Sequence, residues 1–294
     1  MRYARVGVEG QERPVVLTDD GRTLDLSPLT ADVDGAFLGR GVEQVRRALD
    51  AGALPELPVD GLRLGAPLAR PGKIVAIGLN YRKHAQESGA PEPAEPIVFL
   101  KATTSMCGPT DPIRLLPGST TTDWEVELGV VLGSRLTHEP DAGLALGALA
   151  GFVTVNDVSD RDLQLNRGGT WTKGKSADSF CPVGPWLVTA DEIPDPQDLG
   201  LSLWVNGARR QHGSTSDMIF DVGTILSYLS QIMTLEPGDL VITGTPSGVA
   251  MGQPEPRPYL AHGDVVELEV AGLGRQRSTV VAHGSPAGER GSRA

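Results

Sequence analysis

The sequence has few of the residues on which several classes of protein depend. Cys107 and Cys181 are the only cysteines among 294 residues, too few for a disulfide scaffold, and neither has the spacing of a Cys/His metal site. Aromatic residues make up 4% and the formal net charge is −11, which argues against a surface for nucleic acid or for an anionic membrane. No stretch reaches the ~18 apolar residues of a membrane span, and no apolar run follows Met1. We therefore expect a cytoplasmic protein.

The order of strand, helix and turn signals predicts an α+β protein that is mostly β. Residues 1–70 hold short alternating segments and an amphipathic helix over 42–51, and Pro67, Pro71 and Gly72 mark a boundary near residue 70. The following residues carry longer strands, a core helix within 220–235 and a hairpin over 265–282. We expect a small N-terminal α/β domain at 1–70, a larger domain at 71–283 and a disordered tail at 284–294.

Two glutamates interrupt an apolar strand signal at 122–132. Side chains two apart on a strand share a face, so Glu125 and Glu127 point one way while Val126 and Leu128 point the other. Half-buried carboxylates at that separation repel each other and need protonation, a cation or water as compensation. A divalent metal ion is the most specific of these explanations. The alternative is an exposed edge strand with two solvated glutamates.

A third carboxylate, Asp157, ends the strand signal at 151–157. An acidic residue at the end of a strand is suitably placed to be a further oxygen ligand. Three carboxylates with water suit Mg²⁺ or Mn²⁺ better than zinc. Asp157 could instead cap the turn that follows, and the residues alone leave both roles open.

His84 and Glu87 lie three apart in a segment bounded by Gly78 and Gly89. In a helical turn this spacing lets the carboxylate reach the imidazole, which would make a general base with its orienting group. The glycines and the proline-rich run at 91–96 favour a lid that closes over a ligand. A solvated helix with an incidental His–Glu pair explains the same spacing.

Four further polar residues are candidates for ligand binding. Arg161 and Gln164, three apart in a turn, would share a side and could hold a carboxylate and a carbonyl. Lys175 follows a glycine that lets the backbone pass close to a ligand, and Thr245 lies in a small-residue loop able to bind a carboxylate. A solvated lysine and an ordinary turn are the alternatives for the last two.

Taken together, these motifs resemble the fumarylacetoacetate hydrolase superfamily over about residues 72–283. The motifs that carry the resemblance are Gly78-Leu-Asn-Tyr81 with His84 and Glu87, Asp123-Trp-Glu-Val-Glu127, Asn156-Asp-Val-Ser159 with Arg161 and Gln164, Gly174-Lys-Ser176, and Thr243-Gly-Thr-Pro-Ser-Gly248. Within the superfamily, the chain resembles hydrolases of 2,4-dioxo-3-deoxy sugar acids, such as 2,4-diketo-3-deoxy-L-fuconate, and also the acylpyruvases.

The resemblance implies a metal-dependent enzyme. Glu125, Glu127 and Asp157 match the family's metal ligands, here for Mg²⁺ or Mn²⁺, and His84 with Glu87 matches its water-activating pair. The implied fold is a mixed β-roll or β-sandwich behind a small N-terminal domain, in a homodimer.

The resemblance also implies a set of residues that contact a small 2-oxo acid substrate. Lys175 is expected to stabilise a developing oxyanion as well as to bind. The expected substrate-binding residues are Tyr81, Arg161, Gln164, Lys175 and Thr245.

The expected reaction is hydrolysis of the C3–C4 bond of a 2,4-dioxo acid, either a diketo-deoxy sugar acid or an acylpyruvate, to pyruvate and a carboxylic acid. Because the lid carries Asn80, Tyr81, Gln86 and Glu87 and the chain has few aromatics, we expect a polar pocket for a hydroxylated tail. Oxaloacetate-type decarboxylation, hydration, isomerisation and ureidoglycolate cleavage stay open, because such relatives share the acidic ligands. A non-catalytic metal-binding module is the alternative from another class.

Overall fold

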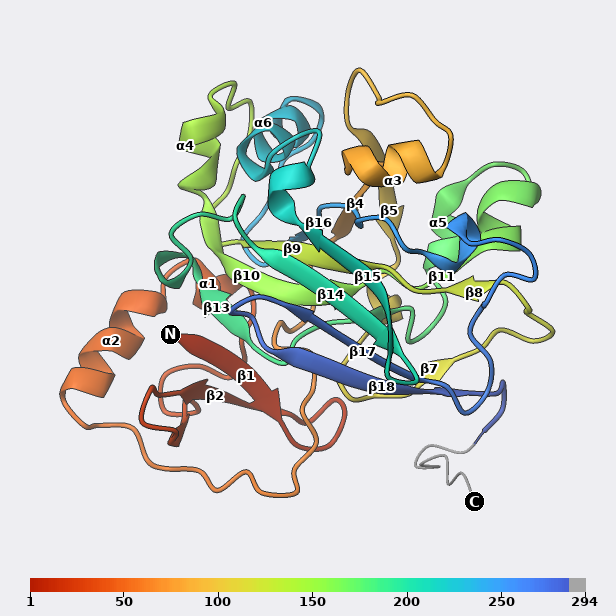
Figure 1. Cartoon of the computed structure of the whole chain (residues 1–294). Coiled ribbons are helices and arrows are strands. Elements are labelled where there is room, and N and C mark those ends of the chain that lie inside the picture. The colour runs from red at the N-terminus through yellow and green to blue at the C-terminus, as the bar shows by residue number, and fades with distance from the viewer. Residues whose placement is uncertain (286–294) are drawn as a thin grey trace.

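The computed structural model describes residues 1–285 and shows a mostly β protein in which short helices surround two main sheets (Figure 1). The predicted fold class is confirmed. From residue 286 onward, the tail predicted to be disordered lies outside the described residues. Within the described part of the chain, no helix is long and apolar enough to cross a membrane.

The larger sheet contains nine strands and includes the N-terminal segment. In spatial order they are β3 (Thr23–Asp25), β2 (Arg13–Leu17), β1 (Arg2–Val6), β13 (Leu187–Thr189), β10 (Leu149–Asn156), β9 (Val126–Leu132), β16 (Leu240–Ile242), β4 (Ile74–Gly78) and β5 (Ile97–Lys101). Strand β1 pairs antiparallel with β13, so the first three strands extend this sheet. The division into domains at residue 70 stays a prediction.

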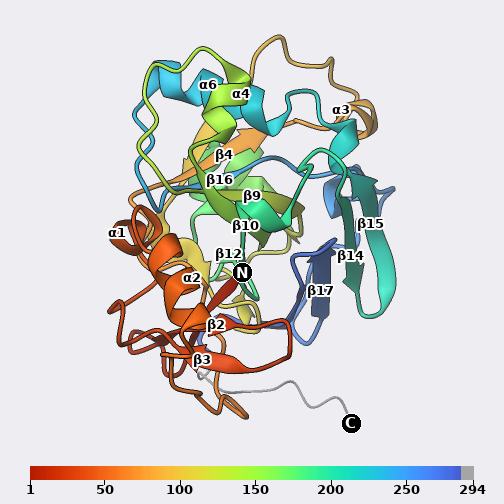
Figure 2. The same cartoon turned by 90° about the vertical axis from the view of Figure 1, so that its left-hand side faces the viewer.

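The second sheet has five strands and packs against the centre of the first. Its strands, in spatial order, are β15 (Ala208–Ser214), β14 (Gly200–Val205), β17 (Val265–Val270), β18 (Arg275–Val281) and β7 (Ile113–Arg114). Strands β14 and β17 contact β9, and Figure 2 shows this sheet beside the larger one. The predicted hairpin is present as β17 and β18. Two small pairs complete the strands: β8 (Thr122–Asp123) with β11 (Ser159–Asp160), and β6 (Met106–Cys107) with β12 (Cys181–Pro182).

The helices are short, and the predicted ones at 42–51 and within 220–235 are present. The α-helices are α1 (Gly35–Leu38), α2 (Val42–Asp50), α3 (Arg82–Glu87), α4 (Ala142–Leu146), α5 (Trp171–Lys175) and α6 (Val222–Ile232). The remaining turns are the 3₁₀ segments η1 (Thr103–Ser105), η3 (Ala190–Glu192), η4 (Thr215–Asp217) and η5 (Ala250–Gly252) and the π-helical η2 (Asp162–Asn166). Asp221 begins α6 because its side chain accepts the Thr224 N–H, and Ile225 on the buried face packs into the core.

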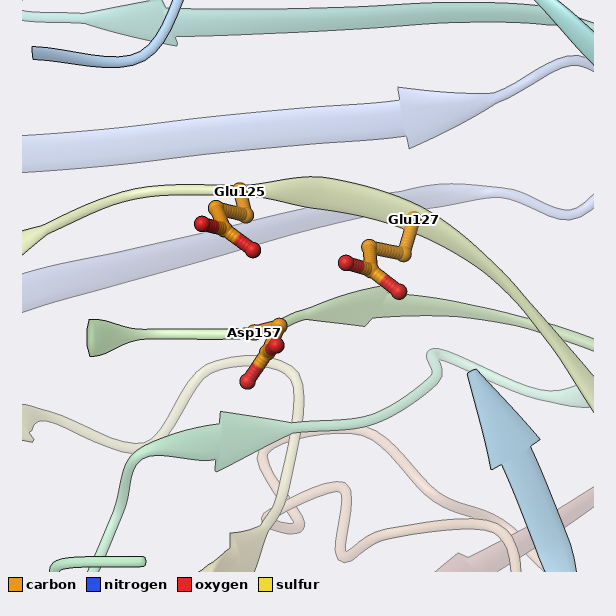
Figure 3. Close-up of side chains that lie close together, drawn as sticks. All are labelled: Glu125, Glu127 and Asp157. Atoms are coloured by element: carbon orange, nitrogen blue, oxygen red, sulfur yellow. The ribbon is translucent and has the colours of Figure 1, made fainter. Parts of the chain in front are cut away.

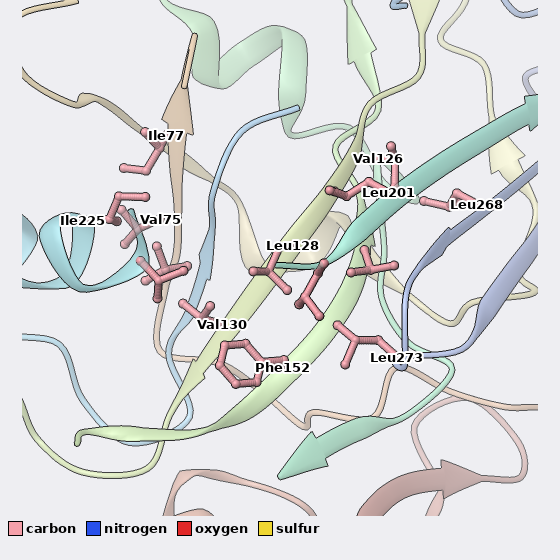
Figure 4. Packing of buried hydrophobic residues seen from close by; sticks show 14 of the residues in the cluster. Val75, Ile77, Val126, Leu128, Val130, Phe152, Leu201, Ile225, Leu268 and Leu273 are labelled. Carbon is pink, nitrogen blue, oxygen red and sulfur yellow. The ribbon is translucent and has the colours of Figure 1, made fainter. Parts of the chain in front are cut away.

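Strand β9 separates the core from the candidate site. Glu125, just before the strand, and Glu127 point to one face (Figure 3). Val126 and Leu128 point to the other, where they pack with Leu201 of the second sheet in the main apolar core (Figure 4). Burying each such side chain contributes about 1.5–3 kcal/mol. The alternation that fills the core therefore also fixes where the two carboxylates lie.

Candidate active site

Pairing of β9 with β10 brings the three predicted metal ligands together. Val155 lies opposite Glu127, and Asp157, one residue beyond β10, donates its N–H to the Glu125 carbonyl at 2.9 Å. One oxygen of each carboxylate lies within 4.8 Å of the other two (Figure 3). The three residues are at most 5% exposed. Because β9 lies between β10 and β16, the alternative of a solvated edge strand is wrong.

Two basic side chains neutralise part of this cluster. Lys175 Nζ lies 2.8 Å from Glu125 Oε2 and 2.6 Å from Asp157 Oδ2, and Arg161 Nη2 lies 2.7 Å from Glu125 Oε1. Burial raises the pKa of Glu125, but Lys175 and Arg161 outweigh it and lower that pKa to about 2. Burial lowers the pKa of Lys175, but Asp157 and Glu125 outweigh it and raise that pKa. Lys175 therefore stays charged beside two carboxylates.

Glu127 is the ligand candidate without a basic partner. Within residues 1–285 it forms no ion pair, and its side chain accepts one hydrogen bond, from the Gly244 N–H at 2.8 Å. Burial raises the pKa of Glu127 well above its usual value, and the charges of Asp157 and Glu125 raise it further. A divalent cation among the three carboxylates would supply the missing countercharge, so these residues fit such an ion.

Lys101 belongs to the cluster although the sequence did not single it out. It ends strand β5, is 3% exposed, and places Nζ 2.6 Å from Asp157 Oδ1 while also donating to the Lys175 carbonyl. A lysine at the inner end of an apolar strand was the available signal, since burial of a lysine requires a partner. Asp157 is thus held by two lysines, and its ion pairs, not a turn cap, fix its carboxylate.

Arg161 and Gln164 lie side by side, as their spacing predicted. Arg161 Nη1 donates to Gln164 Oε1 at 2.9 Å, and Arg161 Nε donates to Asp123 Oδ2 at 2.8 Å. The sequence did not indicate the role of Asp123. This buried carboxylate also accepts the N–H groups of Ala250 and Met251 at 2.8 and 3.0 Å. Asp123 therefore joins Arg161 to the loop that carries η5.

His84 and Glu87 form the predicted pair on helix α3. His84 Nδ1 lies 3.1 Å from Glu87 Oε2, and His84 is 7% exposed. Glu87 also accepts the Gly248 N–H at 2.9 and 3.1 Å, so the carboxylate is held between the helix and a loop. The alternative of a solvated helix with an incidental pair is excluded, because His84 is buried and lines the cavity described below.

Thr245 and Tyr81 are placed differently from each other. Thr245 lines the cavity, but its hydroxyl donates to the Val126 carbonyl at 2.9 Å and accepts from Gln211 Nε2 at 2.7 Å. Tyr81 is fully buried, does not line the cavity, and has no hydrogen-bond partner for its hydroxyl among the described residues. Burial raises the pKa of Tyr81 well above its usual value, and Glu127 raises it further.

Eight of the predicted site residues line one cavity of about 210 Å³. Its charged or polar lining is His84, Ser88, Glu125, Glu127, Asp157, Arg161, Gln164, Lys175 and Thr245. Much of the rest is apolar: Ile77, Leu79, Ala90, Ile97, Phe99, Leu165, Trp171 and Met251. The four lid residues expected to make the pocket polar, Asn80, Tyr81, Gln86 and Glu87, do not line the cavity, whereas His84 and Ser88 of the same segment do. Asn80, for example, is buried and donates to the Phe220 and Thr243 carbonyls.

The family model described as fumarylacetoacetate (FAA) hydrolase C-terminal matches residues 73–281. The chain belongs to this family. Over 276 residues it is 50% identical to a protein of Burkholderia multivorans named "Putative hydrolase", which covers 94% of this chain and 97% of the relative. Membership of the fumarylacetoacetate hydrolase family and this name support a hydrolase-type enzyme.

Solved structures of the same superfamily match nearly the whole chain. Fumarylacetoacetate hydrolase from Exiguobacterium antarcticum is 36% identical with a TM-score of 0.84, covering 96% of this chain and 100% of that one. The 2-hydroxyhepta-2,4-diene-1,7-dioate isomerase from Mycobacterium marinum is 34% identical with a TM-score of 0.74, covering 97% and 100%. Maleylpyruvate hydrolase from Sphingobium sp. SYK-6, solved with manganese(II) and pyruvate, is 29% identical with a TM-score of 0.78, covering 96% and 99%.

Proposed function

We propose that this enzyme hydrolyses the C3–C4 bond of a 2,4-dioxo acid. The oxygen of water bonds to C4, the C3–C4 bond breaks, and C3 takes up a proton, so the products are pyruvate and a carboxylic acid. The observation that carries the proposal is a paired His84 and Glu87 lining the same cavity as three clustered carboxylates. Two structural neighbours named as hydrolases support the reaction class.

Glu125, Glu127 and Asp157 are the residues that would hold a divalent ion, Mg²⁺ or Mn²⁺. Oxygen donors suit both ions, and Glu127 has no ion pair within residues 1–285. The maleylpyruvate hydrolase neighbour carries manganese(II). A bound ion supplies Lewis-acid stabilisation of the negative charge that develops on the 2-oxo acid when the bond breaks.

His84 takes the role of general base in this proposal. Glu87 accepts a hydrogen bond from Nδ1–H, which leaves the other ring nitrogen to take a proton from water as the water attacks C4. Such a base contributes roughly 10²–10⁴ in rate. The hydrogen bond from the Gly248 N–H fixes the Glu87 carboxylate, which in turn fixes the orientation of the His84 ring.

The remaining polar residues bind and neutralise the substrate. Arg161 is the cation for the substrate carboxylate, and its bond to Gln164 Oε1 leaves the Gln164 NH₂ group to donate to a carbonyl. Lys175 stays charged and would stabilise the oxyanion that forms at C4. Thr245 contributes through the position of its loop, because its hydroxyl hydrogen is already donated to a carbonyl.

Isomerisation of a 2-oxo acid is the second candidate, favoured by the match to an isomerase. In that reaction His84 would move a proton between carbons, no water would be consumed, and no pyruvate would form.

The oligomeric state belongs to the same proposal. The family resemblance implies a homodimer, and we keep that expectation. Light scattering after size exclusion should give twice the mass of the 30.9 kDa chain.

One experiment separates the two reactions. The purified protein, with Mg²⁺ or Mn²⁺, is given a simple acylpyruvate while diketone absorbance and pyruvate are measured together. Hydrolysis predicts a metal-dependent loss of absorbance that is matched by an equal amount of pyruvate. Adding a chelator should abolish both the absorbance change and the formation of pyruvate. Absorbance loss without pyruvate would move the enzyme to the isomerases, and no change with any dioxo acid would refute the proposal.

A further inference from the structure

The cavity changes character along strand β5. Ile97, Phe99 and Lys101 alternate with the intervening residues and so share one face of the strand. Lys101, at the inner end, is 3% exposed and ion-paired with Asp157, whereas Ile97, at the outer end, is 36% exposed and lines the cavity. Along one strand face, the side chains thus pass from charged beside the carboxylates to apolar at the rim.

Helix α5 likewise places one charged and one apolar side chain at the cavity. Trp171 and Lys175 are four residues apart and lie one above the other on the helix. Lys175 pairs with the carboxylates, whereas Trp171 packs on Phe99 with ring centroids 5.4 Å apart. The Trp171 ring also packs closely against Gly78, since a Cβ at that position would lie 2.3 Å from the ring. Phe99 and Trp171 are therefore held in place by their packing.

Leu165 adds a fourth apolar side chain at the rim. Its neighbour Gln164 is 4% exposed and turned toward Arg161, whereas Leu165 is 45% exposed and lines the cavity. We call Ile97, Phe99, Leu165 and Trp171 the apolar wall. Ile97 and Leu165 are exposed, and Phe99 and Trp171 are half-buried. Large apolar side chains that are not fully buried around a charged cavity are typical of a surface that a ligand covers.

We infer that the substrate carries a short apolar tail beyond C4, which binds against the apolar wall. This inference rests on the proposed function, because that function places the 2-oxo acid head at the carboxylates and so directs C4 and the tail toward the rim. A hydroxylated tail would place polar groups against side chains that, apart from the Trp171 indole N–H, offer no hydrogen bond. The cavity of about 210 Å³ is smaller than the ~300–1,000 Å³ of drug-sized sites, which restricts the tail to a few carbons.

Binding of uncleavable 2-oxo acids tests the tail separately from the reaction. Straight-chain 2-oxo acids of three to six carbons lack the C4 carbonyl, and calorimetry with saturating Mn²⁺ measures their affinities. We expect Kd to fall about fourfold for each of the first added methylenes. Hydroxyl groups on the same carbons should remove this gain. Affinity independent of chain length, or tighter binding of the hydroxylated acids, would overturn the inference.

A matched pair of substitutions locates the contact. Leu165→Gln should abolish most of the gain between the three-carbon and six-carbon acids while changing the affinity for pyruvate less than twofold. Leu144→Gln is the control, because Leu144 is 67% exposed on α4 and does not line the cavity. A Leu165→Gln protein that keeps the full gain would refute the role of Leu165. If the chain-length series holds but no dioxo acid is cleaved, the proposed reaction fails and the apolar tail site stands.

Discussion

The carboxylate cluster and the His84–Glu87 pair face one cavity but are held in different ways. Glu127 and its neighbours lie on central strands and at their ends, and ion pairs with three basic side chains fix two of the three carboxylates. The pair lies on a six-residue helix, too short to be stable alone, and a loop holds it through the Gly248 N–H. Ion binding and water activation should therefore be separable by substitution.

The largest effect is expected on the cluster itself. Glu127→Gln keeps the size of the side chain but removes one anionic ligand, so ion binding and activity should both fall by more than the ~10²-fold of an outer-shell change. The metal-free variant should unfold at a temperature no lower than the parent, since one of three crowded like charges is gone. Calorimetry with Mn²⁺ and a thermal melt check this. Full activity in Glu127→Gln would show that Glu127 is not a ligand.

The second substitution is expected to affect the His84–Glu87 pair alone. His84→Ala should lower kcat by ~10²–10⁴, because the proposed general base is lost, while Mn²⁺ affinity stays within twofold of the parent. Turnover and calorimetry on the same preparation give both values. A parallel loss of ion affinity would instead make His84 a ligand and join the two regions into one.

Lys101 tests how far the cluster depends on its surroundings. Lys101→Met leaves Asp157 with Lys175 as its one ion-pair partner within the described residues, and Mn²⁺ affinity should change by ~10–100-fold, as for other outer-shell partners. Lys173→Met, at an exposed position of α5, is the matched control and should leave affinity unchanged. Equal affinities in the two variants would contradict a positioning role for Lys101.

The smallest effect should come from the loop behind the pair. A Cβ at Gly252 would lie 2.4 Å from Glu87 Cδ, so Gly252→Ala must displace the Glu87 side chain. We expect kcat to fall by less than ~10²-fold, the loss that a 1 Å misplacement can cause, with ion affinity unchanged. Gly200→Ala, where no atom lies within 4 Å of the added Cβ, serves as the control. Unchanged kcat in Gly252→Ala would mean that the position of Glu87 is not critical.

Local spacing predicted much of this site. The two-residue period of a strand put Glu125 and Glu127 on one face, and the three-residue spacing on a helix brought His84 to Glu87. Both results depend on backbone periodicity, which is a local property. The core helices and the final hairpin were predictable for the same reason.

Residues whose role depends on remote partners were missed. Lys101 and Asp123 acquire their roles from Asp157 and Arg161, which lie 56 and 38 residues away in the sequence. The place of Asn80 was mispredicted because its side chain turns inward to donate to backbone carbonyls, which no local pattern indicates. Strand pairing and helix docking bring these groups together, and a single sequence does not encode them as a spacing.

The alternation along β9 has a consequence for how the chain reaches its native register. A slip of one residue against β10 would turn Leu128 toward the cavity and bury Glu127 between two apolar sheets. An unpaired carboxylate buried there costs several kcal/mol, comparable to a large part of the stability of a whole domain. The glutamates therefore favour the native register during folding. A misregistered strand would bury the same charges that the correctly paired strand exposes to the cavity.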